Sequence, residues 1–136
     1  MDTRMTAGRD RARAILVVEG VEETRDGMAR LLVRDGYEVY AARTPTAAIE
    51  RARIDVPDLI LARLDGVAAD VIRVAAGIRD DAGLGAEVPV VVFCSQCVPE
   101  GAEEVVGANV YATWPDDFDQ LRRLIGRVVG ERGPEV

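Results

Sequence analysis

The sequence predicts a doubly wound α/β domain, in which helices cover both faces of a parallel sheet. Apolar runs of strand length alternate with helical stretches, and a parallel strand needs such a crossover to reach the next strand. The clearest runs, AILVV at 14–18 and PVVVF at 89–93, are apolar throughout, as in strands buried on both faces. With 136 residues, the chain is long enough for one domain with its own core.

The first half of the chain supplies three strands and the two helices between them, at Ala14–Val18, Thr24–Asp35, Tyr37–Ala41, Thr44–Asp55 and Leu59–Ala62. The first helix has apolar residues at helical spacing, and Gly36 follows it where a C-cap glycine belongs. Thr44 and Pro45 open the second helix, with the hydroxyl as N-cap and the proline at the first helical position. Pro57 and Asp58 precede the third strand.

The second half supplies the remaining elements, at Ala68–Arg79, Pro89–Phe93, Pro99–Val106, Asn109–Ala112 and Asp116–Gly130. The first is a helix by its apolar spacing, and the turn-rich sequence DDAGLGAE separates it from the fourth strand. A short acidic helix is expected at 99–106, and Gly107 follows it before the fifth strand. The last helix has an apolar stripe formed by Phe118, Leu121, Leu124, Ile125 and Val128. Five strands thus alternate with five helices.

The ends and the composition of the chain limit its function. Residues 1–13 are polar and aperiodic, so we expect a loose arm before a domain at 14–130 and a short tail at 131–136. The net charge of -7 disfavours a nucleic-acid surface. No window reaches the roughly 18 apolar residues of a membrane span, and the first residues lack the apolar core of a signal peptide. A cytoplasmic protein without membrane contact is expected.

Histidine and cysteine usage narrows the chemistry further. The absence of histidine removes histidine-based acid–base catalysis and histidine metal ligands. Cys94 and Cys97 are too close in sequence to staple a fold, and two cysteines fit a reducing compartment.

Side chains at the carboxyl ends of the predicted strands are the candidates for function, because ligands bind at that edge of doubly wound sheets. These ends carry Glu19 and Gly20, Arg63, Cys94 and Ser95, and Thr113 and Trp114. Arg63 is unexpected, because a permanently charged side chain follows a buried apolar strand. It requires either a partner of opposite charge or a route by which the guanidinium reaches water.

Five sequence blocks follow the predicted strands: ILVVEGVEETR at 15–25, GYEVYAA at 36–42, PDLILAR at 57–63, PVVVFCS at 89–95 and GANVYATWP at 107–115. In these blocks, their order and their spacing, the chain resembles the receiver (CheY-like) domain of bacterial response regulators over about residues 13–130. The resemblance implies a flavodoxin-like fold, with a parallel sheet of strand order 2-1-3-4-5 and five helices on two faces.

Receiver domains accept a phosphoryl group on an aspartate at the end of the third strand. An acidic pair after the first strand holds Mg²⁺, a hydroxyl after the fourth strand senses the phosphoryl group, and a lysine before a proline stabilises its oxygens. The resemblance places these positions at Glu19 and Gly20, Arg63, Cys94, Trp114 and Pro115. Only one carboxylate and the proline are kept, so the residues form a degenerate phosphorylation pocket.

Arg63 cannot replace an aspartate, because a guanidinium has no lone pair to attack phosphorus. We therefore expect no phosphorylation and no Mg²⁺ at this position, no cofactor and no enzymatic activity; Asp65 is the nearest substitute acceptor. Since the first and third strands pair in this fold, Arg63 is expected to form an ion pair with Glu19. The alternative is that Arg63 extends from the strand end into water.

The resemblance implies a signalling module of a two-component or phosphorelay-type system that acts by protein–protein interaction, a pseudo-receiver. Receivers often bind partners through the fourth helix, fifth strand and fifth helix. The candidate face in this chain consists of Glu103, Glu104, Tyr111, Arg122, Arg123 and Arg127. Its acidic and basic patches are expected to pair across a two-fold axis in a homodimer; ordinary solvated helix faces are the alternative.

Two other functions remain open. Cys94-Ser95-Gln96-Cys97 is a C-x-x-C motif between a strand and a helix, which indicates a thiol redox module, with Pro115 as a nearby cis proline. Against it, the motif lacks the flanking residues of thioredoxin-like proteins, and both cysteines can be packing residues. The second is binding of a small anion by Arg63 and backbone amides, although Trp114 is expected to fill part of that pocket.

Overall fold

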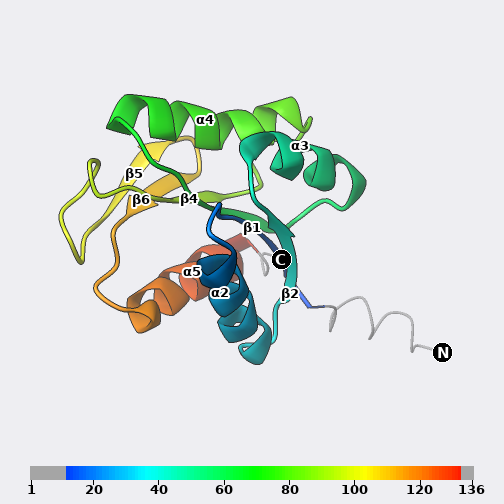
Figure 1. Ribbon diagram of the computed structural model, residues 1–136, viewed down its shortest axis with the longest axis horizontal. Helices are drawn as coiled ribbons and strands as arrows, with labels where there is room; N and C mark the ends of the chain where they lie inside the picture. The colour runs from blue at the N-terminus through cyan, green and yellow to red at the C-terminus, as the bar shows by residue number, and fades with distance from the viewer. Residues whose placement is uncertain (1–11, 133–136) are drawn as a thin grey trace.

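The computed structural model describes residues 12–132. The strands are β1 (Ala14–Val18), β2 (Glu38–Ala42), β3 (Leu59–Arg63), β4 (Val90–Phe93), β5 (Glu103–Gly107) and β6 (Val110–Thr113). The helices are α2 (Glu22–Arg34), α3 (Pro45–Ile54), α4 (Ala68–Asp81) and α5 (Phe118–Arg132). Among the described residues these elements form one six-stranded sheet with α2 and α5 on one face and α3 and α4 on the other (Figure 1).

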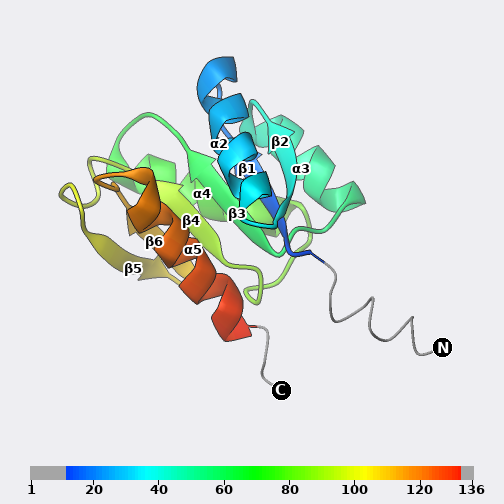
Figure 2. The same ribbon diagram turned by 90° about the horizontal axis from the view of Figure 1, so that it is seen from below.

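The sheet has the order β2-β1-β3-β4-β6-β5. Its first five strands are parallel, so the expected α/β class and order are confirmed, with β6 as the fifth parallel strand. The sixth strand, β5, lies at the edge of the sheet (Figure 2). It runs antiparallel to β6. The sheet is therefore mixed, and the expectation of an all-parallel sheet of five strands is wrong.

The expectation of a helix at 99–106 is also wrong, because this segment contains most of β5. Gly101 has a φ of +87°, a left-handed conformation that interrupts a helix. Val105 and Val106 are β-branched and favour an extended backbone. Pairing with β6 then satisfies the backbone of the segment, and four helices remain among the described residues instead of five.

The expected start of α3 at Thr44 and the expected end of α2 before Gly36 are confirmed. The Thr44 hydroxyl accepts a hydrogen bond from the Ala47 backbone N–H at 3.1 Å and caps α3. Gly36 has a φ of +99°, and its N–H donates to the Val33 carbonyl at 3.0 Å after the end of α2.

Two apolar clusters lie on opposite faces of the sheet. Strand β3 contributes to both, because successive side chains of a strand point to opposite faces. Ile60 and Ala62 belong to the cluster beneath α3 and α4, whereas Leu59 and Leu61 belong to the cluster beneath α2 and α5. All four residues have no exposed surface. The two clusters hold the strand ends, and the side chains that follow them, in fixed positions.

The expected arm and tail lie mostly outside the described residues. The last helix was expected to end at Gly130, but α5 continues to Arg132. Near the other end, the Arg13 guanidinium donates to the Val129 carbonyl at 3.3 Å. No helix within residues 12–132 is long and apolar enough to cross a membrane.

Candidate functional site

The carboxyl ends of four neighbouring strands meet at one edge of the sheet. Val18 of β1 is in register with Ala62 of β3, and Phe93 of β4 is in register with both Arg63 and Thr113 of its two neighbours. The residues that follow in the sequence therefore converge there, as expected from the strand pattern.

Glu19 and Arg63 form an ion pair at this edge. The Arg63 Nη1 lies 3.0 Å from the Glu19 Oε1. The Glu19 side chain is 2% exposed and that of Arg63 is 35% exposed, so the carboxylate is buried while the guanidinium also reaches solvent. The expected pair is thus confirmed. The alternative of an Arg63 that only extends into water is wrong.

The remaining polar atoms of Glu19 are also satisfied. Its Oε2 accepts a hydrogen bond from the Val21 backbone N–H at 2.8 Å. Its backbone carbonyl accepts one from the Arg25 guanidinium at 2.9 Å. The contacts with Val21 and Arg25 were not predicted, because nothing in their sequence positions shows that the first turn of α2 folds back onto Glu19. These contacts fix the carboxylate within the sheet edge.

Gly20, the next residue, leaves space beside this pair. A Cβ atom built on Gly20 would lie 3.7 Å from the Arg43 carbonyl oxygen, an ordinary van der Waals distance. Its φ does not lie in the left-handed region, so the backbone tolerates a Cβ atom. The site lacks a second carboxylate because of the residue type and not because of the backbone.

A pocket of about 220 Å³ lies above Arg63. It is lined by Arg63, Leu64, Asp65, Gly66, Cys94, Ser95, Gln96 and Trp114. A shallower hollow beside it is lined by Arg63, Phe93, Trp114 and Pro115. The structure thus gathers Arg63, Cys94 and Trp114 in one place, and Asp65 lies exposed at the same pocket.

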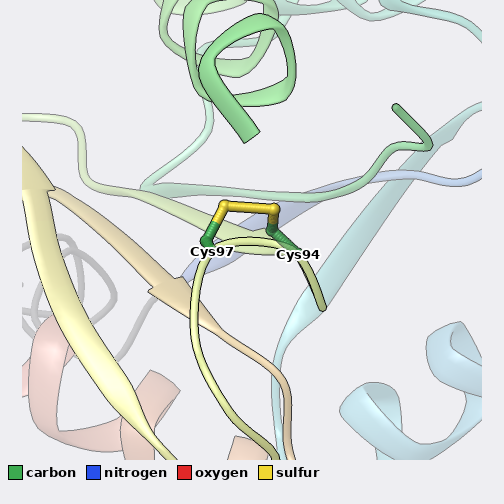
Figure 3. The surroundings of a disulfide bond; sticks show 2 residues. All are labelled: Cys94 and Cys97. Atoms are coloured by element: carbon green, nitrogen blue, oxygen red, sulfur yellow. A yellow bond between two sulfur atoms is a disulfide. The ribbon is translucent and has the colours of Figure 1, made fainter. Parts of the chain in front are cut away.

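Cys94 and Cys97 are joined by a disulfide, with their Cα atoms 5.2 Å apart (Figure 3). Cys94 is 3% exposed and belongs to the apolar cluster beneath α3 and α4, and Cys97 packs against that cluster. Neither cysteine among the described residues is free. The burial of Cys94 agrees with the packing interpretation, and the redox interpretation stays a prediction.

No family model matches the chain, and no curated protein is similar enough in sequence to match. Solved structures do match. A two-component response regulator from Clostridium difficile has 14% identity and a TM-score of 0.67, covering 90% of this chain and 99% of its own. The chemotaxis protein CheY4 of Vibrio cholerae has 20% identity and a TM-score of 0.65, covering 86% and 98%.

A third match is the receiver domain of a sensor histidine kinase from Pseudomonas aeruginosa, with a magnesium ion coordinated in its active-site cleft. It has 22% identity and a TM-score of 0.64, covering 88% of this chain and 98% of its own. The chain has the receiver-domain fold. In this chain the antiparallel β5 occupies the segment where a helix was expected.

Two further expectations, one from the redox interpretation and one about the candidate interaction face, are corrected. Among residues 12–132 there is no cis peptide bond, so Pro115 is not the cis proline expected beside a thioredoxin-like motif. Glu103 and Glu104 lie on the edge strand β5 and not on a helix. Within residues 12–132, no three His, Cys, Asp or Glu side chains lie close enough together to hold a metal ion.

Most charges of the candidate face are paired within the chain. Arg127 on α5 lies 2.7 Å from Glu103 on β5. Arg122 forms two 2.7 Å hydrogen bonds with Asp35, at the end of α2, and one of 2.9 Å with Asp119. The hydrogen bonds with Asp35 raise the pKa of Arg122 above its usual value, so this guanidinium stays charged.

The contact between Asp35 and Arg122 was not predicted, because the two residues are 87 positions apart and no local pattern links them. Likewise, the Tyr111 hydroxyl donates to the Asn109 side chain at 3.0 Å, a contact that depends on the turn between β5 and β6. Among residues 12–132, the exposed side chains of Glu104 and Arg123 have no ion-pair partner.

Proposed function

We propose that the chain is a receiver-like signalling module of a bacterial two-component or phosphorelay-type system. It acts by contact with other proteins and is not phosphorylated at the end of its third strand. The proposal is supported by the receiver-domain fold, which the chain shares with a response regulator and with the receiver domain of a histidine kinase.

The ion pair between the buried Glu19 and Arg63 carries the proposal. In a receiver domain these strand ends supply an Mg²⁺ ligand and the phosphoryl acceptor. Here a guanidinium 3.0 Å from the carboxylate provides the positive charge that Mg²⁺ would provide. Because the guanidinium belongs to the chain itself, the charge of Glu19 is balanced without a bound metal ion or a phosphoryl donor.

Phosphorylation can be tested directly. The purified chain would be incubated with Mg²⁺ and acetyl phosphate, or with beryllofluoride, and followed by intact mass and by the fluorescence of Trp114, which lines the pocket. We expect no adduct and no fluorescence change. A stoichiometric acyl phosphate within residues 59–66, including one on Asp65, would contradict the proposal.

A restored pocket provides the positive control. Gly20→Asp and Arg63→Asp would return both carboxylates, and Trp114→Lys would return the cation before Pro115. The backbone at Gly20 accepts a Cβ atom. Because Arg63→Asp removes the partner of the buried Glu19, circular dichroism in the presence of Mg²⁺ would first establish that the triple variant is folded. We expect this variant, but not Gly20→Asp alone, to bind Mg²⁺ and to form an adduct at position 63. Failure of a folded triple variant would show that more than these side chains has been lost.

For the partner we propose a second copy of the chain, bound through β5, β6 and α5. The argument is charge complementarity. Three of the five charged residues of the candidate face are paired within the chain, which leaves the acidic Glu104 on β5 and the basic Arg123 on α5. Opposite charges on adjacent elements can pair reciprocally across a two-fold axis.

Sedimentation velocity over a concentration series tests the dimer. Glu104→Arg or Arg123→Glu should each weaken self-association, and the swapped pair Glu104→Arg/Arg123→Glu should restore it. Arg73→Glu is the matched control, because Arg73 lies on α4 with 71% of its side chain exposed. A wild-type chain that remains monomeric at every concentration would exclude the second copy as partner.

A further inference from the structure

We infer that Cys94 and Cys97 form a reversible thiol–disulfide exchange site, and that reduction loosens the segment from Cys94 through β5. The reactants are a protein dithiol as reductant and a disulfide as oxidant. This inference concerns a different reaction from phosphoryl transfer and does not depend on the proposed function.

The disulfide closes the turn in which β4 ends. The Cys94 N–H donates to the Thr113 carbonyl at 3.0 Å, which continues the pairing of β4 with β6 by one residue. The N–H groups of Cys97 and Val98 then both donate to the Cys94 carbonyl, at 3.1 and 3.4 Å. In Figure 3 the two sulfur atoms bridge this turn directly.

The two cysteine residues differ in exposure. Cys97 is partly exposed, whereas Cys94 is 3% exposed and faces the pocket that Arg63 also lines. An incoming thiolate therefore reaches the Cys97 Sγ more readily. Cys94 is then the leaving thiolate, and it lines a pocket that Arg63 and Asp65 also line.

The exchange is balanced as two successive displacements. One thiolate of the dithiol attacks the Cys97 Sγ, which breaks the Cys94–Cys97 bond, and the Cys94 thiolate takes a proton. The second thiol of the reductant, as its thiolate, then attacks the mixed disulfide and releases Cys97, which is also protonated. Two electrons and two protons pass to the chain, and the reductant becomes a disulfide; oxidation by a disulfide is the reverse.

The disulfide is a covalent anchor at the start of a segment that is also held at Gly101, whose N–H donates to the Trp114 carbonyl at 2.7 Å, and at Glu103, which lies 2.7 Å from Arg127. The buried Val98 follows Cys97 directly, and a turn closed by the 3.0 Å hydrogen bond from the Ala102 N–H to the Pro99 carbonyl leads into β5. Within the described residues, β5 has only one strand neighbour, β6. Without the disulfide, the turn at 94–97 is held by hydrogen bonds and by the packing of Cys94 and Val98, so this turn and the segment that follows it open more often.

Hydrogen–deuterium exchange of the full chain tests this inference. The oxidised chain would be compared with the chain reduced by dithiothreitol and with the Cys94→Ser/Cys97→Ser variant. We expect exchange at 95–107 to accelerate by roughly tenfold on reduction, with β1, β2 and β3 unchanged. The double variant should exchange as the reduced chain does and should not respond to dithiothreitol.

The state of the cysteines is measured separately, by alkylation and mass spectrometry after equilibration in buffers of defined dithiol-to-disulfide ratio. This readout does not depend on whether the serine variant folds. A chain that stays fully reduced under oxidising buffers, or that exchanges equally fast at 95–107 in both states, would overturn the inference. Neither outcome bears on phosphorylation, so the two proposals fail independently.

Discussion

At the residue scale, the Glu19–Arg63 pair shows why a charge can follow a buried strand. A buried carboxylate is costly unless it is paired and its other lone pairs are satisfied. Here Arg63 and the Val21 N–H each contact one carboxylate oxygen. Arginine suits this position, because its guanidinium is always charged and one end can remain in solvent.

Removing Arg63 should therefore destabilise the fold. Arg63→Ala leaves the buried Glu19 without a cation, and we expect the free energy of unfolding to fall by about 1–3 kcal/mol, less than for a fully buried pair since Arg63 is partly exposed. Urea denaturation measures this change. In a double-mutant cycle, Arg63→Ala should cost less in the Glu19→Gln background, and equal costs in both backgrounds would show that the pair is not coupled.

Tyr37 provides a second prediction at this scale. Burial, and then the nearby negative charge of Asp35, raises the pKa of the Tyr37 hydroxyl. A group whose pKa is raised on folding contributes stability that is complete below its unfolded pKa, about 10, and lost as the pH rises through the folded pKa. None of the 17 basic residues is a lysine, so few other side chains titrate in this range.

The free energy of unfolding of the oxidised chain should thus decline above about pH 10. Guanidinium denaturation at a series of pH values would measure it. In Tyr37→Phe the decline should be shallower, because the neutral ring has no proton to lose. If wild type and Tyr37→Phe lose stability in parallel, burial of Tyr37 is not the cause.

At the element scale, strand β5 marks the limit of prediction from the sequence. The parallel strands were predictable because apolar runs such as Val90–Phe93 must be buried on both faces. The meeting of Glu19 with Arg63 was predictable because the receiver resemblance implies that the first and third strands pair. The segment at 99–107 has no such run and no helical stripe. Its structure depends on pairing with β6 and on the left-handed Gly101, neither of which a local pattern reveals.

Arg79 joins elements at the amino-terminal ends of β4 and β6, opposite the Glu19–Arg63 pair. It is 6% exposed, in the last turn of α4, and its Nη1 donates to the carbonyls of Val88 at 3.0 Å and Asn109 at 3.5 Å. Its buried Nε has no hydrogen-bond partner in the part of the chain described. The Asn109 amide also donates to the Ala86 carbonyl at 2.8 Å, so α4, the loop after it and the turn between β5 and β6 are tied together.

Arg79→Ala should destabilise the fold by about 2–4 kcal/mol, because it removes these hydrogen bonds and leaves a cavity. Thermal and urea unfolding would both report it. The control is Arg73→Ala on the same helix, whose side chain is 71% exposed and pairs only with Asp70, and which should change stability by less than about 0.5 kcal/mol. Similar losses for both variants would argue against the role of Arg79.

At the scale of the whole molecule, the two apolar clusters share one sheet and should unfold together. Leu61→Ala removes a fully buried side chain from the cluster beneath α2 and α5 and should cost about 2–5 kcal/mol. Circular dichroism and Trp114 fluorescence should give coincident transitions, as for a two-state domain. Ile54→Ala, at a side chain 78% exposed, is the control and should have little effect. Separate transitions would show that the faces unfold independently.

The Glu19–Arg63 pair also bears on how long a signalling response would last. A phosphoryl group is added by one protein and later lost by hydrolysis, so its lifetime records how recently a signal arrived. An ion pair between two side chains of one chain is not consumed and does not expire. Under the proposed function, a module built on this pair does not record when a signal arrived, and the duration of its response would be set by how long a partner stays bound or, under the further inference, by how long the disulfide persists.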